Sequence, residues 1–165
     1  MRFDVPRLVR QVLSAVPKAR RTPSPVRERA VPATRTSDTR VDYAPSPNGR
    51  PDPGEVVWAW VPYEEDETRG KDRPVLVLAV DGDTVHALQM TSRDHDRDAA
   101  AEARAGRYWM DVGSGAWDSR GRPSEVRLNR LLTLDANAVR REGAALPRPL
   151  FDRVKSEAER FLAAP

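Results

Sequence analysis

The stretch from Glu55 to Val80, EVVWAWVPYEEDETRGKDRPVLVLAV, decides the fold. Its first part, Glu55–Tyr63, has the period-two pattern of a β-strand, because Val57, Ala59 and Val61 share one face. Arg73–Val80 is a nearly continuous aliphatic run, which is typical of a strand buried on both faces. The polar residues between the two runs predict a loop over residues 63–72.

Further elements follow this pair of strands along the chain. Asp81 and Gly82 form a two-residue hairpin signal, so the next strand should return antiparallel to Arg73–Val80. The later elements that the sequence predicts are a strand at 84–90, a helix at 95–105, strands at 107–112 and 124–134, and a helix at 149–162. Five strands and a terminal helix predict a small antiparallel α+β domain, an SH3-like partly closed β-barrel that spans residues 54–165.

The N-terminal third differs in composition from the rest of the chain. Residues 1–53 contain 11 Lys or Arg against 5 Asp or Glu, and 9 of the 15 prolines. Within residues 1–18, Leu8, Val12 and Val16 fall on one face at helical spacing, which predicts a short amphipathic helix. Residues 19–53 have few large apolar side chains to offset the entropy of ordering them, so they predict a disordered linker.

Composition excludes several classes of site. The 165-residue chain has no cysteine, which removes disulfides, Cys-ligated zinc and a thiol nucleophile. The two histidines, His86 and His95, cannot supply a three-His metal site, and we expect no metal or cofactor. No apolar stretch approaches the roughly 20 residues that span a bilayer, so we expect a cytoplasmic protein.

Residues 53–135 contain a series of linked motifs. Gly54-Glu55 stands at the start of a strand and is followed by an acidic loop, Arg73-Pro74 and the aliphatic strand. A hydroxyl pair, Thr91-Ser92, ends the next strand, and a basic, Leu-rich segment follows at 124–134. In these motifs residues 53–135 resemble the MazF/PemK family of toxin endoribonucleases. The resemblance implies metal-independent cleavage of single-stranded RNA by its own 2′-hydroxyl, a homodimer, and a small antitoxin protein as partner.

The resemblance also implies roles for particular residues. Arg73 would stabilise negative charge on the phosphate, for which a planar guanidinium is suited, and Thr91 would donate its hydroxyl or orient the attacking oxygen. His95 is a candidate for proton transfer near neutral pH, whereas His86 is expected to be structural. The expected RNA-binding residues are Arg69, Lys71, Ser92, Arg93 and Trp117, the last as an exposed ring on which a base could stack.

Two other functions remain open at this point. The acidic run Glu64–Glu67 would repel an RNA backbone, which favours a catalytically inactive SH3-like module of the same fold that binds a partner protein. Alternatively, the basic segment 1–52 binds nucleic acid and the barrel takes no part. RNA cleavage by the wild type but not by Arg73→Ala would separate the enzyme from the module, and deletion of residues 1–52 would test the basic segment.

Overall fold

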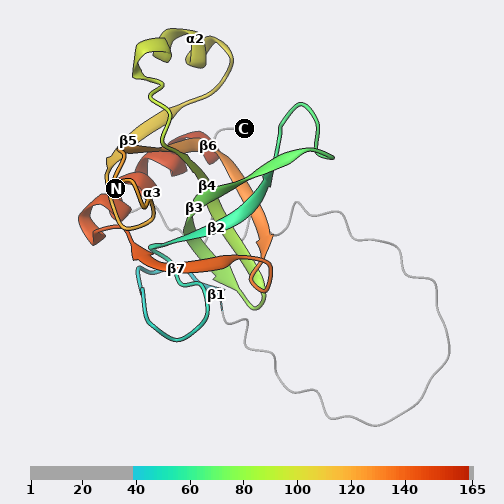
Figure 1. Cartoon of the computed structure of the whole chain (residues 1–165), viewed down its shortest axis with the longest axis vertical. Helices are drawn as coiled ribbons and strands as arrows, with labels where there is room; N and C mark the ends of the chain where they lie inside the picture. The colour runs from blue at the N-terminus through green and yellow to red at the C-terminus, as the bar shows by residue number, and fades with distance from the viewer. Residues whose placement is uncertain (1–38, 164–165) are drawn as a thin grey trace, which may run out of the picture.

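One antiparallel sheet forms the body of the protein in the computed structural model, which describes residues 39–163 (Figure 1). Two long strands, β3 (Gly70–Asp81) and β6 (Ser124–Asp135), run through it, and the strand order is β5-β6-β4-β3-β2-β7. The other elements are β1 (Thr39–Arg40), β2 (Glu55–Pro62), β4 (Thr84–Thr91), η1 (Asp96–Asp98), α2 (Ala99–Arg104), β5 (Trp109–Gly113), β7 (Arg140–Ala145) and α3 (Arg148–Leu162). The predicted α+β barrel with a C-terminal helix is confirmed.

The sheet curls because its ladders are interrupted by bulges. Register shifts lie in β3 between Val77 and Ala79 and in β4 between Leu88 and Met90. A bulge bends its strand and increases the local twist, so the sheet rolls into a half-barrel. One set of aliphatic residues, centred on Val57, Val75 and Val85, is packed on one face of the sheet.

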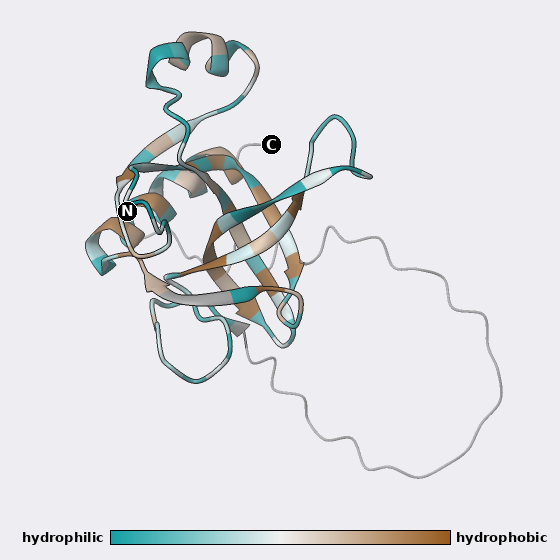
Figure 2. Cartoon of the chain, in the orientation of Figure 1, coloured by the Kyte–Doolittle hydropathy of each residue, from teal (hydrophilic) through white to brown (hydrophobic). Residues whose placement is uncertain are grey.

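Helix α3 covers a second set of core residues. Phe151, Val154 and Ala158 on this helix are buried against residues of β2, β3, β4 and β6. Figure 2 shows hydrophobic residues along the central strands and on α3, and hydrophilic residues in the β2–β3 loop and around α2. Within residues 39–163, no helix has both the length and the apolar content to cross a membrane.

The predicted disorder of residues 39–53 is wrong. Strand β1 pairs with the end of β3, and Asp52 is fully buried and ion-paired with Arg40. The hydroxyl of Tyr43 donates to the carbonyl of Leu146 at 2.8 Å, and its ring lies 5.4 Å from that of Phe151. These contacts fix the segment to the barrel although few of its side chains are large and apolar. The predicted helix at 1–18 and residues 19–38 of the linker lie outside the described residues.

Three further differences concern the later elements. Strand β7, which the sequence did not predict, pairs with β2 although its sequence contains two arginines and a glycine. The predicted helix at 95–105 is split into η1 and α2. Buried His86 lies in β4 as expected of a structural histidine, and neither of its ring nitrogens has a hydrogen-bond partner among the described residues.

Candidate functional site

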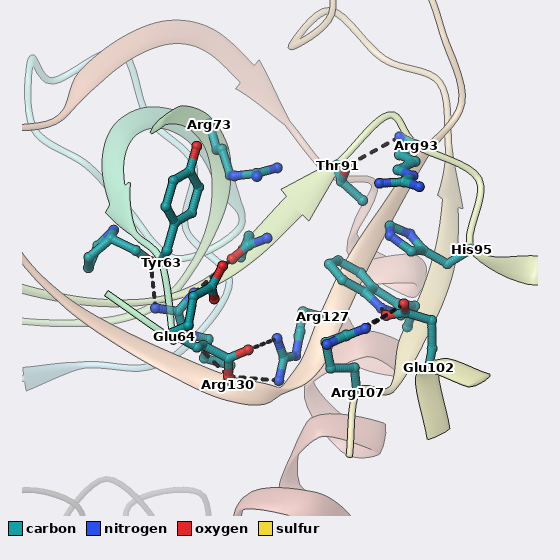
Figure 3. Close-up of a pocket in the computed structure, with 14 residues that line it drawn as sticks. Tyr63, Glu64, Arg73, Thr91, Arg93, His95, Glu102, Arg107, Arg127 and Arg130 are labelled. Atoms are coloured by element: carbon teal, nitrogen blue, oxygen red, sulfur yellow. Dashed lines mark hydrogen bonds and ion pairs between the residues drawn. The ribbon is translucent and has the colours of Figure 1, made fainter. Parts of the chain in front are cut away.

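An open pocket of about 300 Å³ lies beside β3, β4 and β6, between the β2–β3 loop (residues 63–69) and the segment that links β4 to β5 (residues 92–108) (Figure 3). Five arginines and three glutamates line it, so we call it the basic pocket. Its lining residues are Pro62, Tyr63, Glu64, Glu65, Arg73, Gln89, Thr91, Arg93, His95, Glu102, Arg107, Trp109, Arg127 and Arg130.

Arg73 and Thr91 reach the basic pocket from neighbouring strands. Val75 of β3 lies opposite Gln89 of β4, so the two strands continue to Arg73 and Thr91 at the same level. Figure 3 shows both side chains directed into the pocket. The aliphatic run that follows Arg73 is buried and fixes its backbone, which explains how a charged residue is held at this position.

The Arg73 guanidinium is available to an anion. Among the described residues, none forms a hydrogen bond or an ion pair with its side chain, which is half-buried. Every other arginine that lines the pocket, apart from Arg93, is engaged with a carboxylate. An unpaired guanidinium in a partly desolvated site favours binding of a phosphate oxygen.

Thr91 is held by its neighbour's backbone. Its Oγ1 accepts a hydrogen bond from the backbone N–H of Arg93 at 3.1 Å, and the residue is only 8% exposed. Because the oxygen is used as an acceptor there, its own proton remains available for a ligand in the pocket.

His95 is fixed from two sides. Its Nδ1 lies 2.8 Å from Oε2 of Glu125, and its ring stacks on Trp109 with centroids 4.2 Å apart. The backbone N–H of His95 also donates to the Glu125 carboxylate, at 3.2 Å. A carboxylate that accepts from Nδ1–H leaves Nε2 as the ring nitrogen able to exchange a proton with a ligand.

An ion pair between the buried side chain of Arg127 and the exposed side chain of Glu64 lies on the floor of the pocket. Arg127 donates from both terminal nitrogens to the two carboxylate oxygens of Glu64, at 2.7 and 2.9 Å. Arg130 lies beside them, with Nε 3.9 Å from the same carboxylate. The hydrogen bond from Arg127 is the main cause of a lowered pKa at Glu64. Burial lowers the pKa of Arg130, and the nearby charges of Arg127 and Arg73 act in the same direction.

A second ion pair lies at the rim of the pocket. Glu102 of α2 accepts two hydrogen bonds from Arg107, at 2.7 and 2.8 Å, and one from Nε1 of Trp109, at 2.9 Å. These bonds, chiefly those from Arg107, lower the pKa of Glu102 to about 2. The contact with Trp109 orients the indole on which His95 stacks.

Four residues predicted from the sequence meet in the basic pocket: Arg73, Thr91, Arg93 and His95. Arg69 and Lys71 are exposed in the hairpin next to it, and Ser92 follows Thr91 without lining it. The Arg69 guanidinium lies 5.9 Å from the ring centroid of Tyr63. These three residues therefore remain candidates for contacts outside the pocket.

The expectation that Trp117 is an exposed stacking ring is wrong. Its side chain is in the core at 4% exposure, and Nε1 donates to Oγ of Ser124 at 3.0 Å. The ring lies on Gly115, where an added Cβ would come within 2.0 Å of it. Because Gly115 has no side chain, it permits the close approach that buries the tryptophan.

Sequence reasoning missed Arg127 and Arg130 as pocket residues. Alternation in β6 places Val126 and Leu128 in the core, and Arg127 between them carries a buried side chain that faces the pocket instead of solvent. The signal that could have identified them was a pair of arginines within a Leu-rich strand. The sequence analysis interpreted these two residues only as part of a basic segment.

One group of carboxylates has oxygens within 4.8 Å of one another: Asp94, Asp96 and Glu125. The two aspartates are exposed, and the carboxylate of Glu125 binds His95. Asp94 also accepts the backbone N–H of Asp96 at 2.9 Å. Since these groups are used within the protein, we assign no metal to them.

A family model matches most of the residues that the structure describes. Residues 52–162 match a family model described as PemK-like, MazF-like toxin of type II toxin-antitoxin system. This match confirms the resemblance carried by residues 53–135 and extends it through α3.

Two solved structures are similar to the chain. The crystal structure of MazF (Form-I) from Deinococcus radiodurans is 20% identical, covers 70% of this chain and 98% of that one, and has a TM-score of 0.49. The crystal structure of MazE-MazF (Form-II) from the same organism is also 20% identical, covers 70% of this chain and 97% of that one, and has a TM-score of 0.47. No curated protein gives a significant match.

Proposed function

We propose, from the fact that this chain belongs to the PemK-like, MazF-like toxin family of type II toxin–antitoxin systems, that it is an endoribonuclease acting on single-stranded RNA. The family is known for endoribonuclease activity. The observation that carries the proposal is the meeting of the Arg73 guanidinium, which has no partner among the described residues, and the Thr91 hydroxyl in one basic pocket.

The proposed reaction uses the RNA itself as nucleophile. The ribose 2′-oxygen attacks the adjacent phosphorus, the bond to the 5′-oxygen breaks, and the products are a 2′,3′-cyclic phosphate and a 5′-hydroxyl. Arg73 donates to the phosphoryl oxygens as negative charge develops on them, which is worth roughly 3–4 kcal/mol of barrier for one such donor. Because the nucleophile is internal, the reaction requires no metal-bound water.

Thr91 and His95 have separate tasks in this scheme. The Thr91 hydroxyl donates to the phosphate or orients the 2′-oxygen, as its free proton allows. Nε2 of His95 exchanges a proton with the attacking or the leaving oxygen, while Glu125 holds the opposite nitrogen.

The partners follow from the same chemistry. We place RNA along the basic pocket and across the equivalent pocket of a second copy, in a homodimer. A small antitoxin protein would neutralise the enzyme by laying an acidic segment over the same arginines. Both partners would meet the protein in the cytoplasm.

The test is cleavage of a synthetic single-stranded RNA. We expect products with cyclic phosphate ends, activity that persists in EDTA, and no cleavage when the ribose at the cut site is 2′-deoxy. Arg73→Ala should lower kcat by about 100- to 1,000-fold. Arg120→Ala, a charge deletion at an exposed position outside the pocket, is the control and should leave kcat unchanged. Loss of activity in EDTA would contradict the mechanism.

A second function is favoured by one observation. Glu64 and Glu65 lie in the pocket and reduce its positive charge, which suits a module that binds a protein partner without cleaving RNA. Equal failure of the wild type and Arg73→Ala to cleave a mixed pool of RNA sequences would support this function over the nuclease.

A further inference from the structure

We infer that Arg127 and Arg130 form a second phosphate-binding subsite beside Arg73 and Thr91, and that the carboxylate of Glu64 occupies this subsite until an RNA backbone phosphate displaces it. The inference rests on the proposed function for the identity of its ligand. It assigns to the acidic loop a role within RNA binding, as an internal competitor.

Arg127 is preorganised to bind an anion with two oxygens. Its side chain is 7% exposed, and its Nε donates to Oδ1 of Asn129 at 3.2 Å. The guanidinium carbon lies 5.9 Å from the ring centroid of Trp109. The two terminal nitrogens are therefore left to point at the pocket, where a carboxylate or the two free oxygens of a phosphodiester fit equally well.

Arg130 adds a second charge, whose ion pair with Glu64 is longer than that of Arg127 and which also has two uncharged hydrogen-bond acceptors. Its Nη1 donates to Oε1 of Gln89 at 3.0 Å, and its Nη2 donates to the carbonyl oxygen of Pro62 at 2.7 Å. Both acceptors are uncharged, so they fix the guanidinium without cancelling its charge. The nearest carboxylate oxygen, on Glu64, is 3.9 Å from its Nε.

The charges at this place favour a further anion. Arg73, Arg127 and Arg130 are close enough for the first two to lower the pKa of the third, and they share the pocket with Glu64 and Glu65. Three guanidiniums against two carboxylates leave a net positive charge. A backbone phosphodiester that replaced Glu64 would keep the bidentate contact with Arg127. The rest of the RNA chain would add further contacts to the protein.

Glu64 is placed so that it can leave. It belongs to the β2–β3 loop, and its side chain is 44% exposed, whereas that of Arg127 is almost fully buried. The loop is closed at its base by the hydrogen bond from the backbone N–H of Tyr63 to the carbonyl of Arg69, at 2.9 Å. Glu64 lies beyond that bond, so its carboxylate can turn into solvent while the strands remain paired.

The test uses a single-stranded oligonucleotide with 2′-O-methyl ribose throughout, which cannot react and so reports binding alone. Its Kd is measured by fluorescence anisotropy at several salt concentrations for the wild type, Glu64→Gln and Glu67→Gln. Glu67 has the same charge in the same loop but does not line the pocket, so its variant controls for net charge.

We expect Glu64→Gln to bind about five- to tenfold more tightly than the wild type, and Glu67→Gln to differ by less than about twofold. The slope of log Kd against log salt should differ little between Glu64→Gln and the wild type, because the phosphate that displaces Glu64 is neutralised at Arg127 in the wild type as well. Arg127→Gln added to Glu64→Gln should abolish the gain in affinity.

A purely structural role for Glu64 gives the opposite result. If the glutamate only holds Arg127 in place, Glu64→Gln would melt at a lower temperature and bind the oligonucleotide no more tightly than Glu67→Gln, which would overturn the inference. A measurement on the wild type is independent of any folding defect. The ¹³C resonance of the Glu64 carboxyl should move toward that of exposed Glu67 as the oligonucleotide saturates the protein, and an unmoved resonance also overturns it.

Failure of the subsite and failure of the nuclease can be told apart. If ordinary RNA is cleaved but Glu64→Gln shows no gain in affinity, the subsite is wrong and the enzyme stands. If the gain is present but no RNA is cleaved, the subsite stands and the proposed activity is wrong.

Discussion

Oε2 of Glu125, at the start of β6, lies 2.8 Å from Nδ1 of His95, and the same carboxylate accepts the His95 backbone N–H. The glutamate is only 7% exposed, so its attachment to His95 is protected from water. This relationship links β6 to the segment after β4 and orients the His95 ring within the lining of the basic pocket, with Nε2, which has no partner among the described residues, left for a ligand.

The first prediction concerns Glu125 as a positioning residue. Glu125→Gln can donate to Nδ1 and so favours the tautomer with its proton on Nε2, which should lower kcat about 10- to 100-fold. The charged groups near the imidazole include Glu125 from β6 and Glu102 from α2, and the carboxylate oxygens of Asp94 and Asp96 lie within 4.8 Å of those of Glu125. The pH profile of kcat should therefore lose the same limb in Glu125→Gln as in His95→Ala.

Binding separates this role from a structural one. The Kd for an uncleavable 2′-O-methyl oligonucleotide should stay within about twofold of the wild type in Glu125→Gln, since the change acts on proton transfer. A wild-type pH profile in this variant would show that Glu125 does not position His95 for proton transfer.

The second prediction concerns the hydroxyl of Thr91. Thr91→Val keeps the shape of the side chain but removes the proton available to the phosphate, so kcat should fall by about 10- to 100-fold. Thr91→Ser retains the oxygen that accepts the Arg93 N–H at 3.1 Å and should keep most of the activity. Steady-state cleavage rates of the two variants make the comparison, and equal rates would remove Thr91 from the mechanism.

The third prediction concerns stability and pH. Burial lowers the pKa of His86 in the folded protein, whereas the unfolded chain binds a proton with a pKa of about 6.5. The stability that depends on neutral His86 is therefore present above about pH 6.5 and is lost as the pH falls below it, by at most about 1.4 kcal/mol per pH unit.

Urea unfolding at several pH values tests this effect. His86→Leu removes the titrating group, so the free energy of unfolding should depend less steeply on pH between about 5 and 6.5 than in the wild type. The carboxylates titrate in both proteins, and the difference between the two curves isolates the histidine. Parallel curves would contradict the prediction.

The central strands could be predicted from the sequence, unlike β1 and β7, and the pocket could be predicted only in part. Aliphatic alternation in Glu55–Pro62 and the apolar run in β3 are local signals, because each burial pattern is set by the strand's own residues. Arg73 and Thr91 were found through the family resemblance. Their meeting then follows from the antiparallel register of β3 and β4.

Other features depend on contacts between distant residues. Arg127 can be buried because Glu64, 63 positions earlier, accepts hydrogen bonds from both of its terminal nitrogens. An arginine within a strand is by default exposed, and nothing near it in the sequence signals such a partner. Tyr43 likewise packs against Phe151, more than a hundred positions later. Since such a contact cannot be read from nearby residues, the composition of the segment around Tyr43 predicted disorder.

The fourth prediction follows from the burial of Trp117. Trp117→Ala should lower the free energy of unfolding by about 3–5 kcal/mol, because it removes a large side chain from the core. Gly115→Ala should also destabilise the protein, since its Cβ would come within 2.0 Å of the ring. Chemical denaturation measures both, and a Trp117→Ala protein as stable as the wild type would show that the ring is not part of the core.

The fifth prediction tests whether the segment before β2 is part of the domain. Tyr43 donates its hydroxyl to the carbonyl of Leu146 at 2.8 Å, so Tyr43→Phe should cost about 1 kcal/mol of unfolding free energy. Tyr43→Ala also removes the contact between its ring and Phe151 and should cost about 2–4 kcal/mol. Tyr108→Phe, at an exposed tyrosine, is the control and should have little effect. If Tyr43→Ala unfolded at the same denaturant concentration as Tyr108→Phe, residues 40–53 would contribute nothing to the stability of the barrel, and the domain would begin at Gly54 as the sequence alone predicts.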